Sequence, residues 1–500
     1  MTKAIVRNTD KAAARKEADR NARRRAVSDS CRPFVINKGR SVDAIYVPQE
    51  REEWSANPLI SALPRALDTV EAGKRLAREP RYDKDLRSQP GYIRRLLLHG
   101  AMKSLFVPLD VHLDIQQRVQ CAIRTGYSDR NPMNLDYQEK LERQLDEFDQ
   151  YASLDDAEMD SSATTASGFS IVGMSGAGKS RTILRCLQLL PQSISHSLFQ
   201  GQKFTCKQLV WLKLDCPFDG NPKGVCVDFF NIVDAVLGTT YSRNYGSARR
   251  LIIEMLSDMQ LVAGNHYLGV LVVDEIQRLS LGHSGGAAKM LNFFVQLVNK
   301  LGVPVIFIGT YKGMTVLSGE FSQMRRGTGQ GDLIWDRMDN DKQWRHFVQS
   351  LWRYQFVKHD SSPDQAGEKE TLSDALYEES QGIVDFAIKL FMFAQERAIE
   401  TGHERITAGL IRKVAKDKLN IPREVLRALK TKNMAILERF EDLYPLAMKD
   451  YLSGQKLEPK IIGKLSKYPE IAALLKEYFA TQSSSVSSSD SEAPASETEI

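Results

Sequence analysis

The sequence has no long apolar run and few cysteines, and each of these features excludes some classes of protein. No apolar run approaches the roughly eighteen residues of a membrane span, and the N-terminus lacks the apolar core of a secretory signal. The six cysteines are scattered without a Cys-x-x-Cys pair, so we expect reduced, mostly structural thiols and no zinc site. These absences predict a cytoplasmic protein with no membrane partner.

The ends of the chain are also poor in large apolar residues. Residues 3–25 carry nine Lys and Arg residues against three acidic ones, and their apolar residues are mainly alanine, so this segment cannot bury a core. One interpretation is a basic helix that binds DNA phosphates or an acidic partner. The alternatives are a solubilising disordered arm and a mitochondrial transit peptide. Residues 483–500 are serine-rich and acidic, which predicts disorder.

A phosphate-binding loop is the most informative motif. The apolar run from Phe169 breaks into Gly173-x-x-x-x-Gly178-Lys179-Ser180, and apolar residues at helical spacing follow. The glycines let the backbone turn so that its N–H groups point at the phosphates. The lysine reaches the β and γ oxygens, and the serine hydroxyl ligates Mg²⁺. The dipole of the following helix also favours the anion. We therefore expect ATP and Mg²⁺ to bind here. The nucleotide-binding candidates are Gly173, Met174, Ser175, Gly176, Ala177, Gly178, Lys179, Ser180 and Arg181.

A second motif predicts a metal ligand and a hydrolytic acid. The run from Leu268 is apolar and rich in valine, ends in Asp274 and Glu275, and is typical of a buried parallel strand. Asp274 would hold Mg²⁺ together with Ser180, because this hard ion prefers oxygen ligands. Glu275 would polarise the attacking water, which separates an ATP hydrolase from an ATP binder. The alternative is a strand capped by two solvated acids.

Two further runs complete a predicted sheet. Val303–Thr310 and Gln208–Asp215 are both typical of buried strands, and Pro304 stands at a strand start, where a missing N–H is tolerated. Strands alternate with helices between about 165 and 312, which predicts an α/β fold with a parallel sheet covered on both faces. Thr310 would then sense the γ-phosphate, or it is an ordinary loop threonine.

Two polar stretches between the strands are candidates for contact with nucleic acid. One spans residues 217–224, and the other, residues 238–250, interleaves arginines with tyrosines, a mixture suited to phosphates and sugars. Solvated connections between helices are the alternative. The DNA-binding candidates are Lys223, Tyr241, Arg243, Tyr245, Arg249 and Arg250.

From about residue 341 the pattern becomes wholly helical. The runs Trp344–Tyr354, Leu372–Glu379, Ile383–Glu400 and Ala408–Lys418 are separated by short breaks. Such a block fits an all-α lid packed beside a bound nucleotide.

Together these motifs resemble the TnsC/TniB family of ATP-dependent transposition regulators of Tn-seven-type elements. Besides the P-loop and the acid-ended strand, the similar segments are Asn57–Pro64, Arg124–Pro132, Met290–Phe294, Ile308–Thr310, Arg325–Gly327 and Glu404–Gly409. The resemblance covers most of the chain.

The resemblance implies an AAA+ ATPase of the bacterial cytoplasm that forms a homo-oligomer, as a ring or filament, on double-stranded target DNA when ATP is bound. It would link a TnsD/TniQ-like target selector to TnsA/TnsB-like transposase subunits, with hydrolysis controlling assembly and disassembly. Arg325 or Arg326 would reach a neighbouring subunit's nucleotide and neutralise transition-state charge, the alternative being an exposed basic turn. The loops that contain the DNA-binding candidates would line a central channel and grip DNA.

One departure from related initiator-like proteins concerns the lid. Those proteins place a sensor arginine near the start of a lid helix in a Gly-x-x-Arg context, whereas this chain has Gly382-Ile-Val-Asp385. Lys389, one helical turn later, would reach the nucleotide instead or remain solvated. The departure leaves sensing of the γ-phosphate by the lid open and favours slow hydrolysis.

We expect six segments along the chain. They are a flexible basic arm (1–50), an extension before the ATPase core (51–150), the AAA+ core (151–340), the helical lid (341–440), a helical partner-binding segment (441–482) and a disordered tail (483–500).

Three functional classes remain open. They are a DNA-assembled regulator of transposition, a helicase loader or replication initiator of the same fold, and an ATP-binding scaffold in which hydrolysis is incidental. Glu275 beside Asp274 argues against the scaffold, because a binder does not need the second acid. The upstream segments Asn57–Pro64 and Arg124–Pro132 favour the transposition regulator over the loader.

Overall fold

The structure is a computed structural model. It describes residues 39–135, 137–139, 168–218, 221–247, 249–281, 303–310, 329–335, 337–365, 370–420 and 423–431. Most of the expected arm, the partner-binding segment at 441–482, the tail at 483–500, the run Met290–Phe294 and the arginines Arg325 and Arg326 lie outside these residues.

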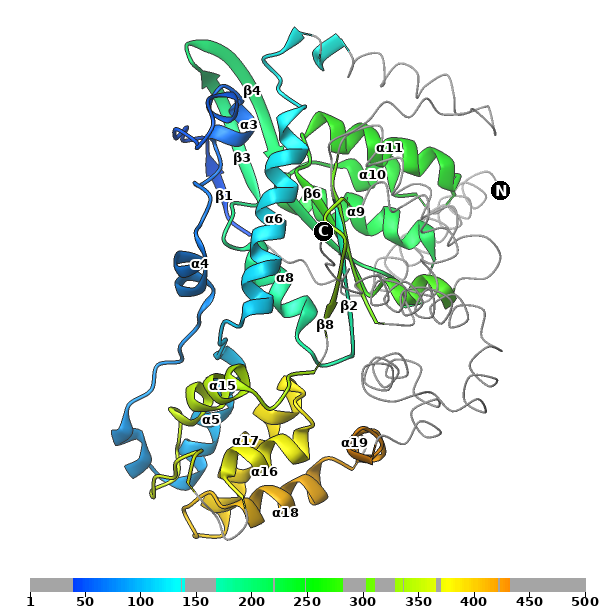
Figure 1. The fold of residues 1–500 in the computed structure, drawn as a ribbon. Helices are drawn as coiled ribbons and strands as arrows, with labels where there is room; N and C mark the ends of the chain where they lie inside the picture. Colours follow the sequence, from blue (N-terminus) through cyan, green and yellow to red (C-terminus); the bar gives the residue numbers. More distant parts are fainter. Residues whose placement is uncertain are drawn as a thin grey trace, which may run out of the picture.

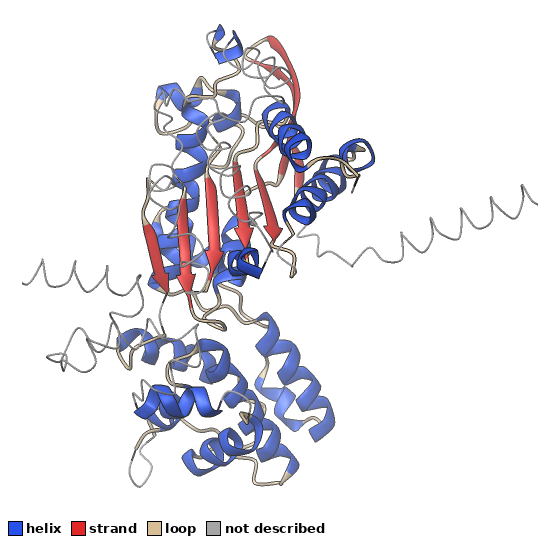
Figure 2. Ribbon diagram, turned by 90° about the vertical axis from the view of Figure 1, so that its right-hand side faces the viewer, coloured by secondary structure: helices blue, strands red, loops and turns tan. Residues whose placement is uncertain are grey.

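A five-stranded parallel sheet forms the centre of the protein, with its strands side by side in Figure 2. The strands are β2 (Phe169–Gly173), β5 (Trp211–Asp215), β6 (Val270–Asp274), β7 (Val305–Gly309) and β8 (Asp332–Trp335), in the order β5-β6-β7-β2-β8. All neighbouring pairs are parallel. The strands β2, β6 and β7 are buried at every residue, which is why their sequences are nearly continuous apolar runs.

Helices cover both faces of this sheet (Figure 1). The helices α6 (Asp110–Ser128) and α8 (Lys179–Leu187) lie on one face, and α9 (Pro222–Leu237), α10 (Tyr241–Tyr245) and α11 (Ile252–Asn265) lie on the other. Each face buries its own apolar cluster. The predicted α/β fold with a covered parallel sheet is therefore confirmed.

The strand predicted over Gln208–Asp215 is confirmed from Trp211 onward, but its first residues belong to a different sheet. A second sheet, of order β1-β3-β4, is formed by β1 (Ser41–Asp43), β3 (Ser193–Phe199) and β4 (Gln202–Leu209). The break falls at Val210, whose N–H donates to the Gln192 carbonyl at 2.8 Å before the chain enters β5. The edge strand β8 was also not predicted, since its four residues are too few to show a period in the sequence.

The two upstream segments named for the resemblance contact each other. The Asn57 side chain donates to the Tyr127 carbonyl at 2.8 Å, and the Arg124 guanidinium donates to the Pro64 carbonyl at 2.6 Å. The second segment also holds the chain that leads into β6, because the Arg130 guanidinium donates to the Leu268 carbonyl at 2.8 Å. The extension is thus packed onto the strand that ends in Asp274. Its small elements are α2 (Glu52–Ser55), α3 (Pro58–Ser61), α4 (Thr69–Leu76) and η1 (Lys84–Ser88).

The C-terminal part is helical, as predicted. Its helices are α15 (Lys342–Trp352), α16 (Leu372–Ser380), α17 (Val384–Glu400), α18 (Ala408–Lys418) and α19 (Arg423–Thr431). Side-chain caps explain where three of them begin: Asp341, Thr371 and Thr407 each accept a hydrogen bond from a backbone N–H of the first turn.

A helix from the extension completes this helical part. The helix α5 (Gly91–Ser104) precedes the sheet in sequence but packs against α17 (Figure 1). The Arg94 guanidinium forms a two-pronged ion pair with the Glu404 carboxylate, with N–O distances of 2.6 and 2.8 Å and side chains only 4% and 11% exposed. The residues expected as one extension therefore contribute to both the core and the lid.

We predict that Glu404→Gln destabilises the helical part by roughly 3 kcal/mol at pH 7, because it leaves the buried Arg94 charge without its partner. The Arg94 hydrogen bond lowers the pKa of Glu404. This stabilisation is therefore complete above the ordinary carboxyl value of about 4.3, and it is lost as the pH falls through the lower folded pKa. Urea denaturation, followed by tryptophan fluorescence, should show the difference between wild type and variant shrinking below about pH 4.

The matched control is Glu400→Gln, which removes the exposed carboxylate that pairs with Arg95. This control should change stability by less than about 0.5 kcal/mol. Equal effects of the two substitutions at pH 7 would contradict the assignment.

Candidate nucleotide site

The P-loop lies between β2 and α8, and its glycines have geometric reasons. At Gly178, the cap of α8, φ is +104°, a left-handed conformation that glycine adopts without strain. At Gly173, a Cβ atom would lie 2.1 Å from the Trp335 carbonyl oxygen of β8, so no larger residue fits beside that strand. The loop therefore requires both glycines for its shape.

Lys179 is the buried cation of this loop. Its side chain is folded back so that the ammonium donates to the carbonyl oxygens of Gly173 and Met174, both at 2.8 Å. The residue is 8% exposed and is the first residue of α8. Its charge thus adds to the positive end of the helix dipole at the mouth of the loop.

The predicted metal ligand and hydrolytic acid lie at the end of β6, which is separated from the P-loop strand β2 by β7. Asp274 is 3% exposed, and its Oδ1 accepts the Glu275 N–H at 2.9 Å. Glu275 has a φ of +59°, a strained conformation for a residue with a side chain, and such strain is concentrated at functional positions. Its carboxylate Oε2 accepts from the Gln277 side-chain amide at 2.8 Å.

A buried lysine that the sequence did not reveal neutralises Asp274. The Lys213 ammonium, on the neighbouring strand β5, lies 2.8 Å from the Asp274 Oδ2 and also pairs with Asp215. Burial disfavours its charged form, but the two carboxylates more than offset that cost and raise the pKa of Lys213. No sequence motif identifies Lys213 as part of the site. The role of a lysine inside an apolar strand becomes evident only when the residue beside it on the neighbouring strand is known.

Thr310 lies at the end of β7, beside these groups. It is 6% exposed, its N–H donates to the Gln277 side-chain oxygen at 3.2 Å, and its hydroxyl is buried without a hydrogen-bond partner among the described residues. A buried hydroxyl that lacks a partner costs about 1–3 kcal/mol, so this one fits a polar ligand in the pocket.

These residues line one pocket of about 410 Å³, a volume ordinary for small-molecule sites. Its polar end is formed by residues 175–182 together with Asp274, Glu275 and Thr310. Its apolar end is formed by the extension and the lid, through Leu105, Phe106, Val107, Leu109, His112, Phe347, Val384 and Ile388. The apolar lining was not predicted, because no sequence pattern distinguishes these apolar residues from those of the core.

The pocket fits a nucleoside triphosphate. Phosphates suit the end that carries Lys179, and a flat base suits the apolar end. Burial lowers the pKa of His112 to about 4, so its imidazole is neutral at physiological pH and adds no charge beside a base. The described residues contain no group of three or more His, Cys, Asp or Glu that could hold an ion alone, so Mg²⁺ would share oxygens of Ser180, Asp274 and the phosphates.

Two predicted nucleotide-binding residues have other partners in the structure. The Arg181 guanidinium donates to the carbonyls of Lys103 and Leu105, both at 2.8 Å, and so ties α8 to the segment that lines the apolar end. The Lys389 ammonium lies 2.5 Å from the Asp385 carboxylate, and Asp385 rather than Lys389 lines the pocket. The lid thus presents an acid to the P-loop, and the predicted contact of Lys389 with the nucleotide is not seen in the structure.

The candidate DNA-binding residues lie around α9 and α10, and none of them lines the nucleotide pocket. Arg243 and Arg249 are exposed, and Lys223 is half-buried. Of the remaining candidates, Arg250 pairs with Glu254 and Asp258, Tyr241 shares a hydrogen bond with His266, and Tyr245 packs against Phe230.

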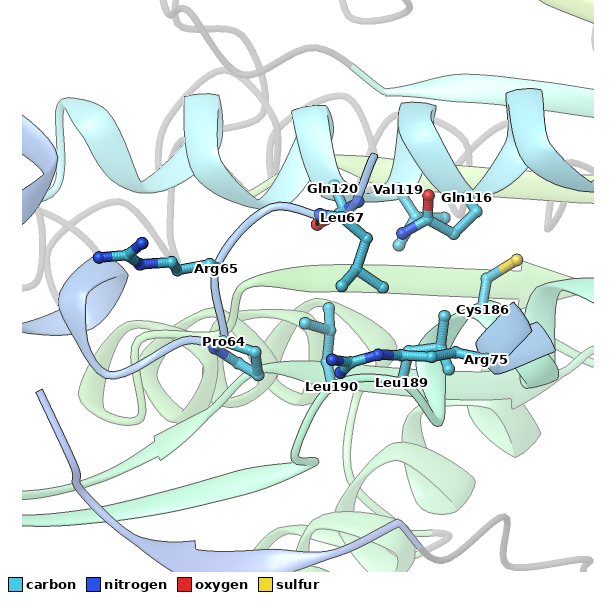
Figure 3. Close-up of a pocket in the computed structure, with 10 residues that line it drawn as sticks. All are labelled: Pro64, Arg65, Leu67, Arg75, Gln116, Val119, Gln120, Cys186, Leu189 and Leu190. Atoms are coloured by element: carbon cyan, nitrogen blue, oxygen red, sulfur yellow. Dashed lines mark hydrogen bonds between the residues drawn. The ribbon is translucent and has the colours of Figure 1, made fainter. Parts of the chain in front are cut away.

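A smaller hollow beside α6 does not compete with this site (Figure 3). Its volume is about 10 Å³, which leaves room for a single water, and its lining includes Pro64, Leu67, Val119 and Leu190. None of the helices in the described part of the chain is long and apolar enough to cross a bilayer.

Residues 163–317 match the family model of an AAA domain. The chain therefore contains an AAA domain with the AAA+ P-loop fold, a parallel sheet core and a helical C-terminal part. This is the fold of ATP-binding ATPases.

Several solved structures are similar to the chain at low identity. They include the Walker-type ATPase PABY2304 of Pyrococcus abyssi (13% identity, covering 66% of this chain and 87% of that chain, TM-score 0.33), the ORC2 protein of Aeropyrum pernix (13%, 64% and 80%, 0.34) and Cdc6p from Pyrobaculum aerophilum (15%, 68% and 87%, 0.33). No curated protein matches the sequence.

We predict that Lys213→Met lowers stability by roughly 3 kcal/mol or more, because it leaves the Asp274 carboxylate buried without a cation. A metal at Asp274 would supply the missing charge, so Mg²⁺ with ATP should raise the melting temperature of this variant more than that of wild type. Thermal melts with Mg²⁺ and ATP, and with ATP and EDTA, measure both effects. The control is Lys203→Met on the exposed side of β4. Equal gains from Mg²⁺ in the variant and in wild type would refute Asp274 as the metal ligand.

Proposed function

We propose that the protein is an ATP-dependent regulator of transposition. It oligomerises on double-stranded target DNA when ATP is bound and links a target selector to the transposase, and ATP hydrolysis controls assembly and disassembly. The observation that carries the ATPase part is Thr310, which lines the same pocket as Lys179, Asp274 and Glu275 and whose buried hydroxyl has no partner among the described residues.

Each residue of the pocket has a role in this proposal. Lys179 neutralises phosphate charge, Thr310 senses the γ-phosphate, and Glu275 polarises the attacking water. Mg²⁺, held by Ser180 and Asp274, supplies a further positive charge that orients the phosphates. Lys389 is a second candidate for the phosphates, provided that it leaves Asp385 when the nucleotide binds.

Completion of the site by a neighbouring subunit explains why hydrolysis would depend on assembly. Arg325 or Arg326 would contribute a guanidinium to the next subunit's nucleotide, as the resemblance implies. Lys223, Arg243 and Arg249 are the candidates for direct phosphate contact on DNA. Tyr241, Tyr245 and Arg250 are DNA-binding candidates as well, and their contacts within the protein would fix the shape of the loop.

The transposition role is supported by the two upstream segments that resemble TnsC. They bond to each other through Asn57 and Arg124, and the second segment holds the chain that leads into β6. A helicase loader or replication initiator is the second candidate, because the match to an AAA domain fits both classes equally. Neighbouring transposase and target-selector genes would support the first function, and neighbouring replication genes the second.

We predict that a non-hydrolysable ATP analogue with Mg²⁺ drives the full chain into oligomers on double-stranded DNA, as measured by analytical ultracentrifugation. Glu275→Gln should hydrolyse ATP at least about a hundredfold more slowly and remain assembled when ATP is supplied, because the water loses its polarising carboxylate. Lys179→Ala is the control, and it should not assemble in response to nucleotide. A monomer under every condition would sink the proposal, and disassembly of Glu275→Gln at the wild-type rate would show that Glu275 is not the hydrolytic acid.

A further inference from the structure

Gln277 lies between two groups of the pocket that have separate roles in hydrolysis. It is in η2 (Ile276–Leu281), the turn that follows β6, and it lines the pocket. Its Oε1 accepts the Thr310 N–H at 3.2 Å, and its Nε2 donates to the Glu275 Oε2 at 2.8 Å. One rigid amide group therefore joins the residue expected to sense the γ-phosphate to the residue expected to polarise water.

Only one orientation of this amide satisfies both neighbours. Turned by 180°, the group would place its NH₂ against the Thr310 N–H and its oxygen against the Glu275 carboxylate, so that donors would face donors and acceptors would face acceptors. A carboxylate at this position would offer acceptors on both sides and repel Glu275. An aliphatic side chain would make neither bond.

Packing fixes the relative positions of Glu275, Gln277 and Thr310. A Cβ atom at Gly309 would lie 2.5 Å from the Ile276 Cγ2 and 3.0 Å from the Gln277 Oε1, so the end of β7 rests directly on η2. On the other side, the strained backbone of Glu275 is held by its N–H bond to Asp274. A shift at Thr310 therefore cannot leave Gln277 in place.

Two donors hold Glu275 in this arrangement. Besides Gln277, the Arg278 guanidinium lies 3.4 Å from the same Oε2 atom, and its other nitrogen donates to the Cys216 carbonyl at 3.0 Å. The Thr310 hydroxyl, in contrast, is buried without a partner among the described residues. A ligand bound to the Thr310 hydroxyl would therefore contact the same residue whose N–H donates to Gln277.

We propose that Gln277 is a positioning residue, which sets the Glu275 carboxylate according to whether the Thr310 hydroxyl holds a phosphate. This inference rests on the proposed hydrolysis of ATP and adds a means of coupling within that site. In this role Gln277 acts on the reaction through the two residues that it joins.

The test is the steady-state ATPase activity of the full chain with DNA and Mg²⁺, together with the affinity for a fluorescent ATP analogue. Gln277→Leu should lower kcat by about tenfold or more while changing nucleotide affinity by less than about twofold, because the lost bonds position the hydrolytic acid rather than the phosphates. Gln277→Glu should lower kcat further, through repulsion of Glu275. Gln277→Asn, which keeps an amide but is too short to span both partners, provides a second test if the leucine variant folds poorly.

A double variant separates coupling from simple loss of structure. If Gln277 and Thr310 act as one unit, Gln277→Leu combined with Thr310→Val should be no slower than the slower single variant. The matched control is Gln208→Leu, which removes a buried amide that joins His196 to the Leu59 carbonyl outside the pocket. This control should lower stability but leave kcat unchanged.

Three results would overturn the inference: an unchanged kcat in Gln277→Leu, a loss of nucleotide affinity as large as the loss of kcat, or additive effects with Thr310→Val. Wild-type protein that hydrolyses ATP without assembling on DNA would refute the proposed assembly and leave the Gln277 result valid. Wild-type protein without any ATPase activity would refute both.

Discussion

The nucleotide site depends on the adjacency of β6, β7 and β2, because parallel neighbours end at the same edge of a sheet. That edge brings together Gly173, Asp274 and Thr310, which are more than 130 residues apart at the extremes. The P-loop after β2 and the acidic residues after β6 therefore lie at the same edge and can line one pocket. This arrangement concentrates negative charge, and the protein offsets it with Lys179 at the loop and Lys213 beneath Asp274.

The pocket is closed by parts of the chain that lie outside the sheet. Segment 105–112, from the extension, and the first turn of α17, from the lid, form its apolar end. Arg181 joins α8 to the first of these segments, and the buried Arg94–Glu404 pair joins α5 to the lid. The extension, the core and the lid are thus joined by side-chain contacts around the site. Asp385 places a carboxylate of the lid near the P-loop, and the Lys389 ammonium offsets its charge.

The sequence was sufficient for those features that a local pattern defines. The P-loop, the acid-ended strand and the helices from residue 341 onward are visible because spacing alone specifies them. The change of sheet at Val210 was not predictable, since an apolar run is the same whichever sheet it joins. Lys213 and Gln277 acquire their roles only from strand pairing and from the contact of η2 with β7. The roles of Arg325 and Arg326 remain predictions, because they lie outside the described residues.

The central claim is that one pocket binds ATP and is completed by a neighbouring subunit on DNA. Electron cryomicroscopy of the full chain with double-stranded DNA, Mg²⁺ and a non-hydrolysable ATP analogue tests it most directly. The account predicts phosphates at residues 175–180, a base against Leu105–His112, and Arg325 or Arg326 of an adjacent subunit beside the γ-phosphate. An empty pocket in DNA-bound particles, or nucleotide bound elsewhere, would contradict it.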